Sequence, residues 1–406
     1  MPKAMVPLLL TVLVVFSAQQ LLTPILAPLS RELSLTETQL GLVITVAAAV
    51  LTVTSPLWGF ALHKIGLRVV LVSGLGLSTA GLTGFAVVAA VGLDRTMPAP
   101  LILTLLLATR SLFLGAGFAA LTVACLAVAG TVTTTVAERV RATGLIGAAQ
   151  GLSMVLGPAA GGSLAVVSLL LPVYLAPVLC LLLMIWVLAA VRPARASAPA
   201  DRHGPRLRPW DARLWPLLAI GFCLYLCLGI VQVTIGFLVA DRLHLGPRET
   251  AGAVGVTLFT AGLVLVTVQG GLVPALGWPV RRLLRVGSPI AASAFALLAV
   301  AGELWLIAAS FGLLALGLGL AFPGFTAAPT LVATPEQQGS IAGVVNSTIG
   351  ATFIVGPLLG TSLYELSPVL PALTGLGVAM TAYTLAWVSP AARRTGSDAV
   401  TAPAEQ

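Results

Sequence analysis

The chain has 406 residues, of which 58% are hydrophobic and only 8% are charged, and its mean hydropathy is +1.06. A soluble core cannot hide so much apolar surface, so a soluble globular protein is excluded and a lipid bilayer is the expected partner. The net charge of +8 does not indicate nucleic-acid binding, because the cations stand between apolar stretches, where they report membrane topology.

Twelve apolar stretches follow one another along the chain, each near the roughly 20 residues that a spanning helix needs. We predict spans at residues 5–27, 39–62, 69–92, 101–123, 142–165, 170–191, 213–240, 250–273, 283–301, 303–325, 340–364 and 369–388. The first stretch is interpreted as a span rather than a signal peptide, because Phe16-Ser17-Ala18 is a poor cleavage site.

The predicted fold is all-α and integral to the membrane, with the twelve helices in two related six-helix bundles. Residues 192–212 are rich in Pro, Ala and Arg and lack apolar periodicity, which predicts a cytoplasmic linker. The domains are therefore expected at 1–191 (N-terminal bundle), 192–212 (linker), 213–390 (C-terminal bundle) and 391–406 (cytoplasmic tail). Since both halves lie in one chain, we expect a monomer.

The distribution of Lys and Arg predicts the orientation. Placing both termini in the cytoplasm puts sixteen of the 21 cations inside. It leaves Arg31, Arg95, Arg242 and Arg248 outside and Arg110 within a helix, as the positive-inside rule requires. The expected location is the inner (plasma) membrane.

Sequence repeats indicate that the two halves arose by duplication. Val155–Leu164 returns 199 residues later as Ile354–Leu363, with a Gly-Pro pair at the same place in each copy. When the sequence is shifted by 212 residues, Gln20 aligns with Gln232 and Glu37 aligns with Glu249. The first helix therefore corresponds to the seventh, and the fifth to the eleventh.

Local patterns predict two helix starts. Before the second span, Ser34-Leu35-Thr36-Glu37 is interpreted as a capping box that opens with Ser34. Before the eighth span, Gly246-Pro247-Arg248-Glu249 provides a Gly cap, a Pro at the first helical position and an acid near the positive helix end.

The end of the second span and the loop after it contain Gly59, His63, Gly66 and Arg68, and this spacing resembles the loop signature of the major facilitator superfamily. The family has an acid where this chain has His63. In that family the acid helps latch the cytoplasmic side, so the resemblance implies either a weaker latch here or one that depends on His63 protonation. A plain interfacial histidine is the alternative.

Arg110 is the one clear charge within a span, and at the membrane centre an unpaired arginine costs about 2.5 to 3.5 kcal/mol on insertion scales. The superfamily often has an arginine here with a glycine four residues later, whereas this chain has Gly115, five residues later. We therefore apply only the arginine of the family pattern to this chain, and not the glycine that follows it. Two roles stay open, a structural bond to its neighbours or a direct contact with substrate.

Gly157-Pro158-Ala159-Ala160-Gly161-Gly162 in the fifth span resembles the superfamily's antiporter motif, which is characteristic of drug and metabolite exporters. Pro removes a backbone hydrogen bond and Gly lets helices touch, so the element predicts a bend and a tight helix seam with or without transport. Gly356-Pro357 is its counterpart in the eleventh span. The whole resemblance covers residues 5–390.

Candidate site residues follow from these assignments. In the superfamily, helices one, four, seven and ten line a central cavity, and polar or aromatic side chains on or near these helices are candidates for substrate binding. They are Gln19, Gln20, Arg110, Phe113, Gln150, Gln232, Phe311 and Asn346. For the aromatic residues, facing lipid is an equal alternative.

No acid falls at mid-membrane in these assignments, although proton-coupled transporters usually need a buried carboxylate. Asp241, Glu303 and Glu365 lie nearest the outer mouth and are the candidates for proton coupling, with hydrated helix-end acids as the alternative. Cys223 and Cys227 share a helix face without His or acid nearby, so we expect no metal site and no cofactor.

The sequence therefore predicts a secondary active transporter rather than an enzyme. We expect an exporter of a small amphipathic or apolar compound, a drug or metabolite, that works by alternating access, with protons as the coupling ion to test first. The alternative is an importer or facilitator of a small neutral or anionic metabolite held by Arg110.

Overall fold

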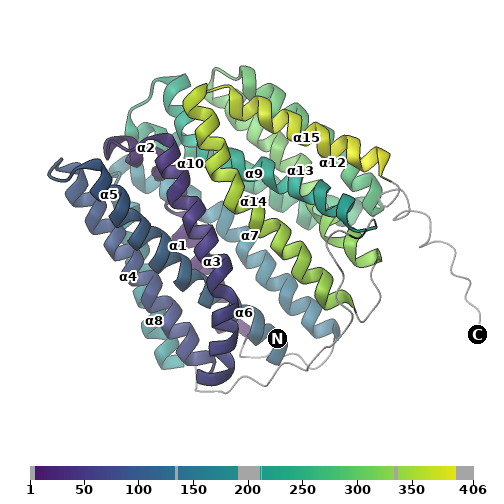
Figure 1. The fold of residues 1–406 in the computed structure, drawn as a ribbon, viewed down its shortest axis with the longest axis horizontal. Coiled ribbons are helices and arrows are strands. Elements are labelled where there is room, and N and C mark those ends of the chain that lie inside the picture. Colours follow the sequence, from purple (N-terminus) through teal and green to yellow (C-terminus); the bar gives the residue numbers. More distant parts are fainter. Residues whose placement is uncertain (1–4, 133–135, 191–210, 212, 333–336, 390–406) are drawn as a thin grey trace, which may run out of the picture. The chain divides into compact units, whose positions relative to one another are not determined.

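The computed structural model describes residues 5–132, 136–190, 211, 213–332 and 337–389, and for some of these, including His63, the backbone alone (Figure 1). The predicted linker, apart from Asp211 near its end, and the predicted tail lie outside the described residues. All regular elements of the described residues are helical.

The helices up to residue 190 form the first six spans. They are α1 (Met5–Gln20), α2 (Thr23–Glu32), α3 (Glu37–Ile65), α4 (Leu67–Leu93), α5 (Ala99–Leu106), the π-helix η1 (Leu107–Phe113), α6 (Leu114–Val132), α7 (Val136–Val167) and α8 (Leu171–Ala190). The first span is α1 with α2, and the fourth is α5, η1 and α6 in succession.

The helices after residue 213 form the other six spans. They are α9 (Trp215–Leu243), α10 (Pro247–Thr267), the π-helix η2 (Val268–Leu272), α11 (Val273–Leu276), α12 (Val280–Val300), α13 (Leu304–Val332), α14 (Gln338–Leu366) and α15 (Leu370–Val388). Within the described residues, 12 helical stretches are long and apolar enough to cross a membrane, which confirms the predicted fold class.

The chain divides into two compact units. The first unit comprises residues 1–199 with 235–259, and the second comprises 200–234 with 260–406. The stretch Ile235–Phe259, the end of α9 and the start of α10, therefore packs with the first six helices. The domain boundaries expected from the sequence, at 191 and 213, stay a prediction.

The first span is not one continuous helix. α1 ends at Gln20, and α2 begins at Thr23 with Pro24 in its first turn. Since proline has no N–H and cannot donate a hydrogen bond to the carbonyl of the preceding turn, it favours a new helix start over continuation. The Leu22 N–H donates to the Gln19 carbonyl three residues earlier at 3.3 Å, so the chain forms a tighter turn at Leu21 and Leu22 than an α-helix does.

The predicted cap of the second span is wrong by two residues. The N-cap of α3 is Thr36, whose hydroxyl accepts from Gln39 N–H at 3.2 Å while Gln39 Oε1 accepts from Thr36 N–H at 3.0 Å. Ser34 instead adopts a positive φ of 58° in the preceding turn. Glu37 is thereby left with its carboxylate available for another partner. At the eighth span the expected cap is confirmed, because Glu249 Oε2 accepts from Gly246 N–H at 3.2 Å.

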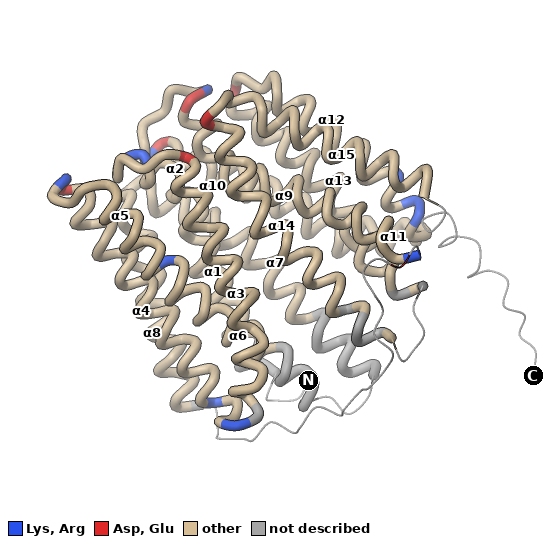
Figure 2. The backbone as a smooth tube through the Cα atoms, in the orientation of Figure 1, with Lys and Arg blue, Asp and Glu red and all other residues tan. Residues whose placement is uncertain are grey.

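Charges gather at the helix ends in each unit (Figure 2). In the first unit Glu37, Asp94 and Asp241 lie at one end and Lys64 and Arg68 at the other. The second unit has Glu303 and Glu365 at one end, opposite the Arg281 and Arg282 turn of α12. This separation is what the positive-inside assignment requires, while the cytoplasmic placement of the termini stays a prediction.

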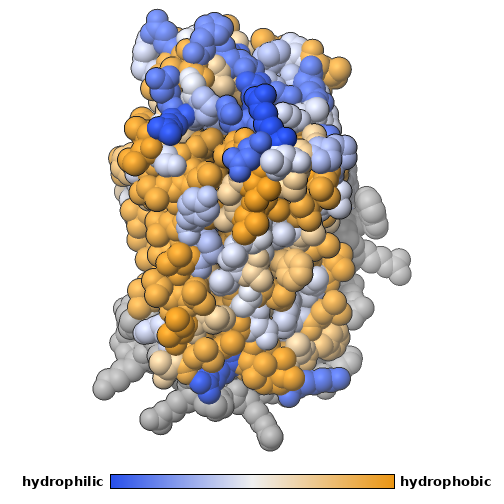
Figure 3. Space-filling model, turned by 90° about the vertical axis from the view of Figure 1, so that its left-hand side faces the viewer, coloured by the Kyte–Doolittle hydropathy of each residue, from blue (hydrophilic) through white to orange (hydrophobic). Residues whose placement is uncertain are grey.

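Between the charged ends the surface is apolar. On the face shown in Figure 3, hydrophobic residues cover most of the middle, and hydrophilic ones collect mainly at the top with a smaller number at the bottom. Large hydrophobic side chains are correspondingly exposed, with Val53 at 68% and Phe60 at 70%. Exposure of this extent is expected where lipid, not water, is the solvent.

Small residues allow the helices to approach closely in both units. A Cβ at Gly74 of α4 would lie 2.8 Å from the Ala120 Cβ of α6, and one at Gly287 of α12 would lie 2.5 Å from the Gly317 carbonyl oxygen of α13. In the second unit α12 lies beside both α13 and α15 (Figure 1). Such contacts give packing energy where the hydrophobic effect between helices is absent.

Candidate functional site

Arg110 is the centre of the candidate site. It lies in η1, midway along the fourth span, and only 7% of it is exposed. Its Nε has no hydrogen-bond partner, and no acid of the described residues forms an ion pair with it. A buried cation without a partner is costly, and a role for Arg110 in substrate binding stays a prediction.

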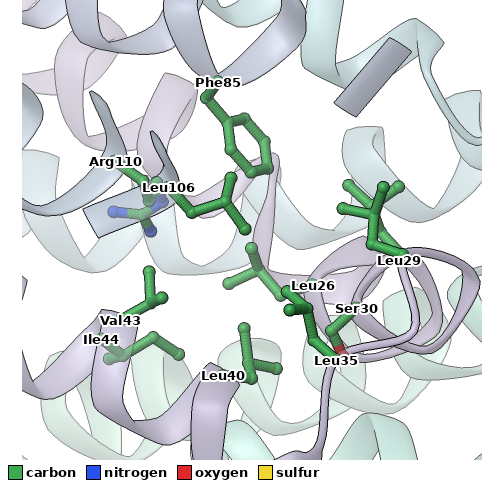
Figure 4. Close-up of a pocket in the computed structure, with 11 residues that line it drawn as sticks. Leu26, Leu29, Ser30, Leu35, Leu40, Val43, Ile44, Phe85, Leu106 and Arg110 are labelled. Carbon is green, nitrogen blue, oxygen red and sulfur yellow. The ribbon is translucent and has the colours of Figure 1, made fainter. Parts of the chain in front are cut away.

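A small cavity adjoins Arg110, with a volume of about 20 Å³ (Figure 4). Its other walls are almost entirely apolar: Leu26, Leu29, Ser30, Leu33, Leu35, Leu40, Val43, Ile44, Phe85 and Leu106. A volume of this size holds about one water molecule. A larger ligand can reach Arg110 only if the surrounding helices move apart.

The π-helix explains the unusual spacing after Arg110. A π-helix bonds residue i to i+5, and a single π-turn inserts one extra residue into an α-helix. The five-residue interval from Arg110 to Gly115, one longer than the family spacing, spans the end of η1. Gly115 still faces α3, since a Cβ there would lie 2.9 Å from the Ala47 carbonyl oxygen. The π-turn therefore accommodates the extra residue, and Gly115 keeps its close packing against α3.

Gln19 and Gln20 lie at the end of α1, beside the break in the first span. The Gln19 Oε1 is buried and has no partner. Gln20 instead contacts α7, because a Cβ at Gly157 would lie 2.4 Å from its Cβ. The first unit thus contains an unsatisfied acceptor on Gln19 and an unsatisfied donor on Arg110, two of the residues predicted from the sequence.

The first Gly-Pro element forms a tight seam within the first unit. A Cβ at Gly161 would lie only 2.0 Å from the Leu21 carbonyl oxygen, and one at Gly162 would lie 2.7 Å from the Cα of Gly255 in α10. Pro158 lies within α7, and a Cβ at Gly255 would lie 3.0 Å from its carbonyl oxygen. α7 therefore packs backbone to backbone against both the first span and α10.

The second element repeats this contact within the second unit. A Cβ at Gly356 of α14 would lie 2.8 Å from the Cα of Gly229 in α9, and one at Gly360 would lie 2.7 Å from the Ile230 carbonyl oxygen. Pro357 lies within α14, and its carbonyl accepts from the Thr361 hydroxyl at 2.8 Å. Each copy thus packs against the first span of its own half.

The other predicted substrate-binding residues are dispersed. In the first unit, Gln150 of α7 is half-buried and Phe113 of η1 is 46% exposed. Within the second unit, Gln232 of α9 is half-buried, Phe311 of α13 is buried and Asn346 of α14 is exposed. Their roles in binding stay predictions.

Two aromatic pairs join helices that the sequence placed around the cavity. Phe16 of α1 and Phe118 of α6 lie with their ring centroids 4.6 Å apart in the first unit. Tyr225 of α9 stacks on Phe322 of α13 in the second unit, with centroids 4.1 Å apart. Phe16 and Tyr225 were not among the residues singled out from the sequence. Since such pairing depends on tertiary contacts, position on the first and seventh spans was the one signal available.

The three candidates for proton coupling have different surroundings. Asp241 of α9 forms an ion pair with Arg31 of α2. Glu303, just before α13, is exposed and accepts a hydrogen bond from Trp305 Nε1. Glu365, near the end of α14, is also exposed. A role in coupling stays a prediction for all three.

The loop motif forms the turn between α3 and α4. Gly66 has a φ of 84°, a left-handed value that favours glycine, and it ends α3 while it begins α4. Arg68 Nη2 donates to the Leu188 carbonyl of α8. A Cβ at Gly59 would meet open space, and the His63 side chain lies outside the described residues.

The profile of the Major Facilitator Superfamily matches residues 8–357. The chain belongs to the major facilitator superfamily. As predicted, it is a multi-pass membrane transporter and not an enzyme, and its superfamily relatives include drug-resistance proteins.

Among the relatives of this superfamily member, the class D tetracycline resistance protein of Salmonella ordonez is 28% identical over 359 residues, 85% of each chain. The class B protein of Escherichia coli is 27% identical over 266 residues, which are 63% of this chain and 65% of that one. The structure of the human organic anion transporter MFSD10 has a TM-score of 0.65 at 19% identity and covers 95% of this chain and all of its own. That likeness shows the same fold.

Proposed function

We propose that this superfamily member exports a small amphipathic or largely apolar compound by alternating access. The observation that most supports the proposal is the seam of α7, where Gly161 and Gly162 contact the first span and α10 backbone to backbone. This is the element that resembles the antiporter motif of exporters. The tetracycline resistance proteins among its relatives support the same direction of transport.

The substrate class follows from the groups that lack partners. Arg110 provides a buried donor and Gln19 a buried acceptor, and the cavity walls beside Arg110 are apolar. A ligand with an apolar body and one small polar head satisfies the Arg110 donor and covers the cavity walls with hydrocarbon. Strongly cationic compounds are disfavoured, because no acid pairs with Arg110 in the described part of the chain.

Protons are the proposed coupling ion. Inverted membrane vesicles offer a direct test with tetracycline as the probe, because an exporter then accumulates the compound inside. We expect uptake that stops when a protonophore collapses the proton gradient. Uptake that persists without the gradient contradicts proton antiport, and absence of uptake with tetracycline and with a panel of other amphipathic compounds contradicts export.

Transport of an organic anion is a second candidate function. It is favoured by Arg110, the buried cation without an acidic partner, and MFSD10 is an organic anion transporter by name. A carboxylate on an apolar body pairs well with a guanidinium, which donates two parallel hydrogen bonds. Fluorescein as the probe distinguishes the two candidates, because an organic anion transporter moves fluorescein and loses this transport in Arg110→Gln, whereas an exporter of neutral amphipathic compounds does not move fluorescein.

A further inference from the structure

A basic cavity lies at the start of α12 in the second unit. Its volume is about 400 Å³, and it is lined by Pro279, Arg281, Arg282, Arg285, Val286 and Trp387. Three of these six residues are arginines within two turns of one helix, and Trp387 comes from the end of α15. This end of the second unit is the one expected to face the cytoplasm.

Two tryptophans and the backbone of α15 hold the cavity in shape. Arg285 Nε donates to the Ala386 carbonyl at 3.0 Å, and its guanidinium lies 3.9 Å from the centre of the Trp387 ring. Arg282 lies 4.2 Å from the centre of the Trp278 ring. Stacking of this kind orients a guanidinium without using all of its five N–H donors.

Acidic partners for the rim of the cavity are absent from the described residues. Neither Arg281 nor Arg282 forms an ion pair there, and both are at least partly accessible. The cavity therefore combines positive charge, a defined shape and, on Arg281 and Arg282, cations that no carboxylate of the described residues pairs with. Its ligand is expected to be an anion with several acceptor oxygens.

We propose that this cavity binds the phosphate head group of an anionic phospholipid. The cavity lies at the ends of two spanning helices, α12 and α15, where a bilayer places its head groups. Tryptophans at this depth are typical of the membrane interface, and basic pockets between spans on the cytoplasmic side bind anionic lipids. Trp387, 47% exposed, and Val286 then face the glycerol and the upper acyl chain.

The test compares two double variants of the full chain in detergent. Arg281→Gln with Arg282→Gln removes the unpaired cations but keeps Arg285, which holds α12 to α15. Arg95→Gln with Arg248→Gln removes the same charge from exposed positions in the other unit and is the matched control. Each protein is exposed to an equimolar mixture of phosphatidylglycerol and phosphatidylcholine, and bound lipid is counted by native mass spectrometry.

We expect the wild-type protein and the control to retain phosphatidylglycerol in preference to phosphatidylcholine. Removal of two cations should lower phosphatidylglycerol retention about tenfold or more, since each contributes substantially to anionic lipid binding. Equal retention by the two double variants at unchanged melting temperature overturns the proposal. Displacement of the lipid by millimolar inorganic phosphate also overturns it, because the ligand is then a soluble phosphate compound.

Discussion

Arg31 and Asp241 form a two-point ion pair that joins the end of α2 to the end of α9 in the first unit. Nη1 donates to Oδ1, and Nη2 donates to Oδ2 at 2.9 Å. The same guanidinium donates to Glu37 Oε1 at 2.8 Å and lies 5.0 Å from the centre of the Phe237 ring. Bidentate pairs between arginine and a carboxylate are among the stronger polar contacts in proteins. Movement of α9 away from α2 requires this pair to break.

Removal of the pair should ease separation of these helix ends. We predict that Asp241→Asn lowers the free energy of unfolding by about 1 kcal/mol, a small effect because both side chains are more than a third exposed. It should also raise the labelling rate of a cysteine placed at Leu33, which is buried at the end of α2. Asp94→Asn removes an exposed acid at the same end without breaking an ion pair and is the control. Equal labelling in both variants would show that the Arg31–Asp241 pair does not hold α2 and α9 together.

Arg110 should reduce stability while supporting transport. We predict that Arg110→Met abolishes transport and raises the free energy of unfolding by about 2 kcal/mol, because an unpaired buried charge is costly. If Arg110 has only a structural role, Arg110→Met should instead lower the free energy of unfolding. Thermal unfolding and transport, both measured on the purified protein in lipid, distinguish the two roles that the sequence left open.

The α7 seam should respond to one added methyl group. Gly161→Ala places a Cβ 2.0 Å from the Leu21 carbonyl oxygen, so the helices must shift, and we predict a loss of about 1 to 3 kcal/mol. Gly147→Ala and Gly151→Ala on the same helix place the Cβ in open space and should have no destabilising effect. If all three variants melt alike, the seam does not contribute to stability.

The second Gly-Pro element should show the same sensitivity. Gly356→Ala places a Cβ 2.8 Å from the Gly229 Cα, whereas Gly377→Ala in α15 of the same unit meets open space. We predict that the first variant melts at a lower temperature than the second, again by the equivalent of about 1 to 3 kcal/mol. If Gly356→Ala melts at the same temperature as the wild-type protein, only the first copy of the element forms a tight seam.

Long-range periodicity made most of the fold predictable. Spanning helices are defined by some 20 consecutive apolar residues, so their number and approximate positions can be read without tertiary contacts. The break at Leu21 and Leu22 was missed because Pro24 sits inside a continuous apolar run. The cap of α3 was misplaced because Ser34 and Thr36 both begin patterns typical of a capping box.

The candidate site was only partly predictable. Arg110 and Gln19 were identified because polar residues are rare within spans, and the structure finds an unsatisfied atom on each. The π-helix around Arg110 has no sequence pattern of its own. The one indication of it in the sequence was the extra residue between Arg110 and Gly115. The Arg31 and Asp241 pair joins residues 210 positions apart, so no local pattern could reveal it.

The most direct test of the account is transport by the reconstituted protein and its Arg110→Gln variant under an imposed proton gradient. Proteoliposomes are given tetracycline and fluorescein as probes, in separate assays, with the amount of inserted folded protein matched between the two proteins. We predict that the wild-type protein accumulates at least one probe against its gradient only while the proton gradient lasts, and that Arg110→Gln does not. Equal transport of every probe by both proteins would contradict a role for Arg110 in the transport site.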